Sequence, residues 1–249
     1  MVFVHILYRL IIMRVAIVTT MWKRPEIFSV FATQCKYLKD KYGNLELIVT
    51  GSEAHVSREQ AERYGFTYIE HANKPLGRKQ NQSAIRSKDF DVDYIICLGS
   101  DDLITESLYE RYLEYFSKGF DFIAPLDCYF IDSVSKRSLY WAGYRGAWLG
   151  MTCGAGRALS KKLLKKLGWQ PWFDDQYSDV LDTGMDKKLE TIQHTRFTFY
   201  LGKDYLIDIK SPVNMTTFER WDNSGFYDTN ELLKSIPHNV RQLLTNISR

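Results

Sequence analysis

The chain has 249 residues, of which 45% are hydrophobic and 25% are charged, the balance of an ordinary globular protein. This length suits one α/β domain, alone or with an appendage, and it is ample for a buried core. The net charge of +3 is too small to indicate a nucleic-acid-binding surface, so nucleic acid is not expected as a partner.

The first twelve residues are apolar but are interrupted by His5 and Arg9. This run is too short to span a bilayer, and no small-residue cleavage site follows it. We interpret residues 1–12 as an N-terminal extension upstream of the first strand, with a weak membrane-surface anchor as the alternative. The sequence therefore predicts no firm membrane insertion and a cytoplasmic protein, in the host cytoplasm if the source is viral.

The first half of the chain alternates between strand and helix patterns. Pro25 suits the first turn of a helix. The apolar stripe that follows it has helical spacing and consists of Phe28, Phe31, Cys35 and Leu38. The strands expected here are 15–19, 45–49, 66–69 and 94–98. Three helices are expected, of which the first begins at Pro25 and the other two cover 56–64 and 77–86. Such alternation predicts right-handed crossovers and a mostly parallel sheet. This architecture is typical of a nucleotide-binding half.

After residue 102 the pattern changes to a mixed sheet. The elements expected here are a helix at 108–116, strands at 122–126, 128–131 and 138–141, a glycine-rich bend at 150–156 and a helix at 159–167. No linker rich in Pro, Gly or Ser separates the halves. We therefore predict one domain over 13–249, made of a nucleotide-binding half (13–102), an acceptor half (103–229) and a C-terminal helical tail (230–249).

The four cysteines are widely separated, and no C-x-x-C pair occurs. A structural zinc site is therefore not expected. Cys35 and Cys97 lie on apolar faces, where cysteine behaves as a small buried hydrophobe. Nothing in the cysteine pattern indicates an oxidising compartment.

The apolar run from Tyr94 to Leu98 leads, through Gly99 and Ser100, into the adjacent carboxylates of Asp101 and Asp102. The carboxyl end of such a strand is where open α/β sheets bind ligands. Two neighbouring carboxylates repel each other, so a divalent cation or a hydrogen-bonding ligand would stabilise both as anions. The alternative is that one of them caps the helix that begins near Thr105.

Four ordered blocks carry a family resemblance. They are VAIVTTMWKRPE (15–26), LELIVTGS (45–52), NKPLGRKQNQSA (73–84) and LGSDD (98–102). With them, residues 14–189 resemble family-2 glycosyltransferases, of which small stand-alone forms occur in bacteria and large DNA viruses. The resemblance implies the GT-A fold, in which helices flank a mostly parallel central sheet and a mixed sheet forms the acceptor half.

The resemblance also implies a donor site and a metal site. The expected contacts to the nucleotide-sugar donor are Thr19, Thr20, Arg24, Ser52, Gly77, Arg78, Lys79, Asn81, Ser100 and Asp101. Asp101 and Asp102 would hold Mn²⁺ or Mg²⁺, because these cations prefer hard oxygen ligands. For Arg78 and Lys79 the alternative is a solvated helix start, and for Asn81 it is a helix cap.

Two positions depart from the family pattern. Gly99 stands where the family commonly places an acid that contacts ribose or metal. Thr50 and Gly51 stand where an acid reads uracil, with Glu53 just beyond. A uridine diphosphate sugar remains the expected donor.

An inverting transfer needs a general base for the acceptor hydroxyl. Related enzymes use an acid that opens a helix, and the segment 182–189 matches that pattern with Asp182 in its place. The further candidates are Asp186, one turn along the same face, and then Asp174 and Asp175. A helix cap is the alternative for Asp182. Trp141, Trp169 and Trp172 are candidates for an acceptor platform or for core packing. The resemblance also implies that His194 and the segment 208–214 lie where related enzymes bring a C-terminal loop over the donor, and His194 is a candidate metal or phosphate contact.

These features together predict a metal-dependent glycosyltransferase that moves a sugar from a nucleotide diphosphate to a hydroxyl of a glycan, glycoprotein or glycolipid, with inversion. One alternative is a nucleotidyltransferase that makes sugar nucleotides, although such enzymes usually carry a glycine-rich loop after the first strand, and residues 19–23 contain no glycine. The other alternative is a non-catalytic module that binds nucleotide sugars, against which the acids Asp101, Asp102 and Asp182 argue.

Overall fold

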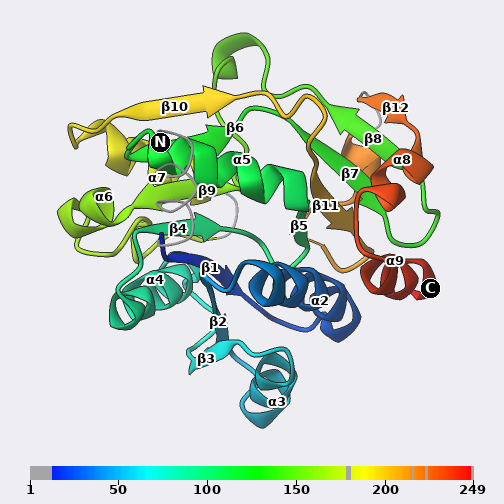
Figure 1. Ribbon diagram of the computed structural model, residues 1–249, viewed down its shortest axis with the longest axis horizontal. Helices are drawn as coiled ribbons and strands as arrows, with labels where there is room; N and C mark the ends of the chain where they lie inside the picture. The colour runs from blue at the N-terminus through cyan, green and yellow to red at the C-terminus, as the bar shows by residue number, and fades with distance from the viewer. Residues whose placement is uncertain (1–12, 178–180, 215, 222–223, 248–249) are drawn as a thin grey trace, which may run out of the picture.

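The computed structural model describes residues 13–177, 181–214, 216–221 and 224–247. The predicted extension, residues 1–12, lies outside the described residues. The chain forms two sheets with helices packed around them (Figure 1). Within the described ranges, no helix is both long and apolar enough to cross a bilayer.

The larger sheet has seven strands in the order β10-β6-β9-β4-β1-β2-β3. These are β1 (Val15–Thr20), β2 (Leu45–Gly51), β3 (Thr67–Glu70), β4 (Tyr94–Cys97), β6 (Phe122–Pro125), β9 (Arg157–Ser160) and β10 (Arg196–Phe199). Strand β1 pairs in parallel with β2 and β4, so that Val15 lies opposite both Leu45 and Tyr94. Strand β9 runs antiparallel to both of its neighbours, β4 and β6. The carboxyl ends of β1, β2 and β4 therefore lie at one edge.

Helices bury both faces of this sheet. Side chains alternate between the two faces along a strand, so Val15 and Ile17 join one core and Ala16 and Val18 join the other. The first core is covered by α2 (Pro25–Tyr42) and α5 (Glu106–Ser117), and the second by α4 (Leu76–Arg86), α6 (Lys161–Lys166) and α7 (Leu181–Glu190). Helix α3 (His55–Arg63) lies beside β3 (Figure 1).

The smaller sheet has the order β12-β8-β7-β11-β5. Its strands are β5 (Asp102–Ile104), β7 (Cys128–Asp132), β8 (Ser138–Trp141), β11 (Leu206–Lys210) and β12 (Gly225–Tyr227). Strand β11 pairs in parallel with β7 and antiparallel with β5. This pairing brings a late segment of the chain against the residues that follow β4. The tail forms α8 (Thr229–Lys234) and α9 (His238–Asn246), and α9 packs on α2.

Most predicted elements appear within a few residues of their expected bounds, but the predicted helix at 159–167 is wrong in its first turn. Residues 157–160 form β9, which fills the space between β4 and β6 and is buried throughout. The helix α6 starts only at Lys161. Ser160 is its N-cap, and the Ser160 hydroxyl accepts the hydrogen bond of the Leu163 amide. Strands β5, β10, β11 and β12 were not predicted. The predicted division into a nucleotide-binding half and an acceptor half stays a prediction.

Candidate active site

The two adjacent acids lie in the connection from β4 to β5, at the carboxyl edge of the larger sheet. A β-carbon built on Gly99 would lie 2.7 Å from Oδ1 of Asp101 and 2.8 Å from Oδ2 of Asp102. Both carboxylates therefore converge on Gly99, whose amide donates to Oδ2 of Asp102 at 2.5 Å. This convergence is the physical reason for glycine at a position where an acid was expected, because any side chain would displace one of the carboxylates.

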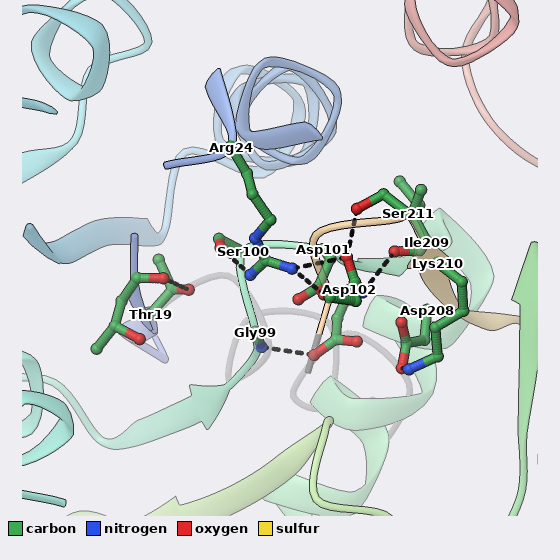
Figure 2. A network of polar contacts seen from close by, with 12 residues as sticks. Thr19, Arg24, Gly99, Ser100, Asp101, Asp102, Asp208, Ile209, Lys210 and Ser211 are labelled. Carbon is green, nitrogen blue, oxygen red and sulfur yellow. Dashed lines mark hydrogen bonds and ion pairs between the residues drawn. The ribbon is translucent and has the colours of Figure 1, made fainter. Parts of the chain in front are cut away.

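Arg24 reaches this pair from the turn that precedes α2 (Figure 2). Its Nη1 bonds Oδ2 of Asp101 at 2.5 Å, and its Nη2 donates to the Ser100 hydroxyl at 3.0 Å. Asn214, from the segment after β11, donates to the same Asp101 oxygen at 2.8 Å and accepts from Arg24 at 3.1 Å. The predicted donor contacts Arg24, Ser100 and Asp101 are thus brought together. Asn214 belongs to the segment 208–214, for which the family resemblance implied a position over the donor, although no role had been predicted for Asn214 itself.

A third carboxylate adjoins Asp102. Asp208 on β11 stands opposite Asp102 in the ladder between β5 and β11, and Lys210 donates to its Oδ2 at 2.6 Å (Figure 2). Burial, together with the charges of Asp208 and Asp101, raises the pKa of Asp102 well above its usual value. Burial also raises the pKa of Asp208 to about 6. Three carboxylates thus face the two cationic side chains Arg24 and Lys210, which leaves an excess of negative charge.

Neither acid of the pair caps the next helix, so the capping alternative is wrong. Thr105 is the N-cap of α5, and its hydroxyl accepts the amide hydrogen of Leu108. Asp102 is instead the first residue of β5 and is 6% exposed. Asp102 is thus a buried carboxylate that caps no helix and lies beside two other carboxylates. A negative charge in this position needs a cationic or hydrogen-bonding partner.

The donor set fits a small divalent cation completed by a substrate. In the described part of the chain, no group of three or more His, Cys, Asp or Glu side chains is arranged to hold a metal ion. Two convergent carboxylates, Asp101 and Asp102, match the way Mg²⁺ is usually held, by one or two carboxylates together with substrate phosphates and water. The Oδ1 atom of Asp208 is buried and has no hydrogen-bond partner among the described residues, which also indicates uncompensated negative charge.

Lys79 joins three segments at the ends of the first strands. Its buried ammonium donates to the Met21 carbonyl at 2.7 Å, to the Ser52 hydroxyl at 2.9 Å and to Oδ1 of Asn73 at 2.9 Å. Burial lowers the pKa of Lys79 to about 8. All three of its hydrogen-bond donors are used, so Lys79 fixes the turns that line the predicted donor site. Its interpretation as a solvated helix start is wrong, because it is 1% exposed.

Other predicted donor contacts are committed to the scaffold. The Asn81 carboxamide makes three hydrogen bonds, with the carbonyl and amide of Trp172 and with Oδ1 of Asp174. A β-carbon at Gly77 would overlap the carbonyl oxygen of Phe173. Both residues hold the segment 172–176 against α4, and the cap interpretation of Asn81 is wrong because its amide acts across the fold. Thr19 is fully buried.

Arg78 and Thr20 are further predicted donor contacts that remain accessible. Arg78 is 52% exposed and lies 3.9 Å from Asp174. Thr20, the last residue of β1, is half-buried.

A cleft opens beside Arg24 and Ser100. Its walls are formed by Met21, Trp22, Lys23, Arg24, Pro25, Phe28, Glu53, Val56, Gln60 and Ser100. The Tyr68 ring lies against Gly51 at the end of β2, where a β-carbon would meet the phenol oxygen at 2.7 Å. An acid therefore has no room at position 51, and Glu53 is the acid that lines the cleft.

The candidate base Asp182 stands in the first turn of α7. A β-carbon at Gly154 would overlap both of its carboxylate oxygens, so the carboxylate rests directly on that glycine. Asp186, the second candidate, is held by two arginines, since Oδ2 accepts from Arg157 at 2.9 Å and Oδ1 from Arg196 at 3.4 Å. Of the third pair of candidates, Asp174 accepts from Asn81, while Asp175 is exposed.

Of the two roles predicted for Trp169 and Trp172, core packing is confirmed, because both are buried beneath α4, α6 and α7. The predicted metal or phosphate contact of His194 is wrong at this site. His194 precedes β10, at the end of the sheet where β6 and β10 begin, so it lies at the edge opposite to Asp101. Trp141 is half-buried and packs edge-on against Tyr144 and Trp221. The four cysteines are buried free thiols, which confirms the prediction for Cys35 and Cys97.

The fold is that of nucleotide-diphospho-sugar transferases of the GT-A type, as predicted. S. aureus TarS 1–349 in complex with UDP-GlcNAc aligns over 94% of this chain and 70% of its own, with a TM-score of 0.59 and 12% identity. A mannosyltransferase from Pyrobaculum calidifontis in complex with GDP-Man and Mn²⁺ aligns over 93% and 68%, with a TM-score of 0.56 and 12% identity.

A cytidylyltransferase from Leptospira borgpetersenii also shares the fold. It aligns over 95% of this chain and 98% of its own, with a TM-score of 0.51 and 13% identity. No family model matches the sequence, and no curated protein is similar to it in sequence.

Proposed function

We propose that this protein is a glycosyltransferase that transfers a sugar from a nucleotide diphosphate donor, a uridine diphosphate sugar, to a hydroxyl group of a glycan, glycoprotein or glycolipid. The observation that carries the proposal is the convergence of Asp101 and Asp102 on Gly99 at the carboxyl edge of the sheet, where Arg24 bonds Asp101 and also lines the adjoining cleft. In folds of this kind the ligand binds at that edge. The structures similar to this chain include complexes with UDP-GlcNAc and with GDP-Man and Mn²⁺.

In the proposed reaction, Asp101 and Asp102 would hold Mn²⁺ or Mg²⁺, which would supply Lewis-acid neutralisation of the charge that grows on the leaving diphosphate. Arg24, whose guanidinium already lies beside Asp101, adds a forked donor suited to phosphate oxygens. Arg78, at the exposed start of α4, is proposed to make a further phosphate contact.

Asp182 is proposed as the general base. Its carboxylate takes the proton of the acceptor hydroxyl while the acceptor oxygen bonds to the anomeric carbon. The bond from that carbon to the diphosphate oxygen breaks, and the nucleoside diphosphate leaves with the electron pair. Attack from the face opposite to the leaving group inverts the anomeric configuration. Asp186 is not the proposed base, because both of its oxygens accept from arginines.

The nucleobase is proposed to bind in the cleft between Trp22 and Glu53. The Trp22 side chain is 46% exposed and offers an aromatic face. Oε2 of Glu53 accepts the Lys23 amide at 2.8 Å, which orients this carboxylate in the cleft wall. Glu53 thus takes the place of the acid for which position 51 has no room.

A thermal-unfolding screen tests the proposal. Uridine, guanosine and cytidine diphosphate sugars are added with and without Mn²⁺, and the donor that stabilises the fold is then incubated with sugar acceptors. A true donor at about 100 times its Kd adds about 2.7 kcal/mol of stability. Release of nucleoside diphosphate that requires an acceptor supports the proposal, and the absence of any donor-dependent shift with any divalent metal contradicts it.

The structural likeness to a cytidylyltransferase gives a second candidate function, synthesis of a sugar nucleotide. The same preparation is incubated with nucleoside triphosphates and sugar 1-phosphates. Release of pyrophosphate would favour this function. The stretch from Met21 to Arg24 contains no glycine, so it lacks the glycine-rich loop typical of such enzymes, and we expect no pyrophosphate.

A further inference from the structure

Arg157, the first residue of β9, is a buried guanidinium with four hydrogen bonds. It is 1% exposed. Nε donates to the carbonyl of Cys153 at 3.0 Å, and Nη1 donates to the carbonyl of Asp182 at 2.8 Å. Nη2 donates to the carbonyl of Thr152 at 3.3 Å and to Oδ2 of Asp186 at 2.9 Å. One side chain therefore ties the loop before β9 to the first two turns of α7.

The same loop also supports the side chain of Asp182. Gly154 lies beneath its carboxylate, and a β-carbon there would overlap Oδ1, Oδ2 and Cγ. The backbone of Gly154 is outside the left-handed region, so alanine is compatible with its φ angle and only the added volume is excluded. The loop thus fixes Asp182 twice, through Arg157 at its main chain and through Gly154 at its carboxylate.

We propose that Gly154 and Arg157 are positioning residues that hold the Asp182 carboxylate where it accepts the proton of the acceptor hydroxyl. The inference rests on the proposed function and adds to it the residues that hold the general base in position. A general base acts only within hydrogen-bond reach of the proton that it removes. A misplacement of about 1 Å can lower the rate about 100-fold, and a methyl group on Gly154 forces a displacement of that order.

The test compares Gly154→Ala with Gly225→Ala. Gly225 in β12 is a matched control, because its φ is also outside the left-handed region and no described atom lies within 4 Å of an added β-carbon. For Gly154→Ala we expect kcat to fall about 100-fold, while the donor KM and the Mn²⁺-dependent thermal shift stay unchanged. For Gly225→Ala both kinetic constants should match the wild type.

A double-mutant cycle separates positioning from general damage to the fold. In an Asp182→Asn background, Gly154→Ala should lower the residual kcat less than twofold, because no base remains to be misplaced. A loss in that background as large as in the wild type overturns the inference, as does a kcat within twofold of wild type for Gly154→Ala alone. A wild-type protein that transfers no sugar to any acceptor would instead refute the proposed function.

Arg157→Lys and Arg157→Met extend the test to the second residue. Lysine keeps the charge beside Asp186 and part of the hydrogen bonding, whereas methionine keeps only the volume. We expect the lysine variant to recover part of the kcat that the methionine variant loses, with an unchanged donor KM. Equal kcat values for the two variants and the wild type would overturn the role of Arg157. If methionine prevents folding, the comparison of lysine with the wild type decides.

Discussion

The replacement of Asp102 by asparagine should have opposite effects on the free protein and on its complex. Burial and the nearby charges of Asp208 and Asp101 raise the pKa of Asp102, so the folded state disfavours the charged form of this side chain. Asparagine removes this charge and keeps an oxygen for the Gly99 amide. We therefore expect Asp102→Asn without ligand to be at least as stable as the wild type at neutral pH.

The sign of the pH dependence follows from the same shift. Because the pKa is raised in the folded state, the wild type loses stability as pH rises from the ordinary aspartate value toward the folded value. The variant lacks this loss. Its stability relative to the wild type should therefore increase as pH rises through that interval and decrease toward acid, and urea unfolding at several pH values measures the difference.

The complex should behave in the opposite way. Donor at about 100 times its Kd with Mn²⁺ adds about 2.7 kcal/mol to the wild type, which raises Tm by about 5–10 °C for a chain of this size. If the loss of one anionic ligand weakens binding about 100-fold, the same concentration adds only about 0.4 kcal/mol. The shift in the variant should then be about 1 °C.

The matched control is Asp127→Asn. Asp127 is also buried, its pKa is also raised by burial, and it accepts from the Tyr140 hydroxyl at 2.7 Å and the Leu201 amide at 2.9 Å. It lies outside the candidate site, so its variant should keep the full Mn²⁺-dependent shift. A full shift in Asp102→Asn as well would refute the assignment of Asp102 to the metal site.

Three further predictions follow from the described contacts. Asp182→Asn should leave the donor-dependent thermal shift intact and lower kcat by about 10²–10⁴-fold. NMR of the wild-type product should show an inverted anomeric configuration. Near-normal turnover of the variant, or a retained anomer in the wild type, would refute the assigned base. Lys79→Met should remove a pH dependence of the free energy of unfolding. Because the pKa of Lys79 is about 8 in the folded state, the wild type should become more stable relative to the variant as pH rises from 8 toward 10.5. Urea unfolding at pH 7 and pH 9.5 measures this difference, and equal differences at the two pH values would contradict the prediction. Asn81→Ala should lower the free energy of unfolding by about 1–3 kcal/mol, since it leaves the Trp172 amide without a hydrogen-bond partner and leaves the Trp172 carbonyl with the Lys188 ammonium alone. Calorimetry should show a Tm lower by about 2–12 °C, and a change under 2 °C would contradict the scaffold role.

The sequence alone was sufficient for the elements whose signals are local. The apolar stripe of α2, the proline in its first turn and the buried run of β4 are read within a few residues, and the structure places them as expected. The order of strands and helices in the first half also follows from local patterns, because hydrophobic periodicity directly reflects which face of an element is buried. The pair Asp101 and Asp102 was found in the same way, as polar residues at the end of such a strand.

The partners of that pair depended on the tertiary structure. Asn214 bonds Asp101 across 113 positions of sequence, and Asp208 meets Asp102 only because β11 pairs with β5. Strand β9 was mistaken for the start of a helix, because four residues between a glycine-rich bend and a basic helix carry too little periodicity to distinguish the two. Contacts of this kind are set by how elements pack, and a single sequence carries no local signal for them.

The candidate base shows the same division. A family pattern indicated Asp182 from residues next to it in sequence, but the pattern did not distinguish a base from a helix cap. The structure separates Asp182 from Asp186, because Arg157 and Arg196 occupy the second carboxylate while the first rests on Gly154. The local sequence determined which residue types could do the chemistry. Only the packing of distant segments against one another decided which of these side chains are free of arginine partners and which are held in place, because burial, charge pairing and close contact are properties of the folded chain.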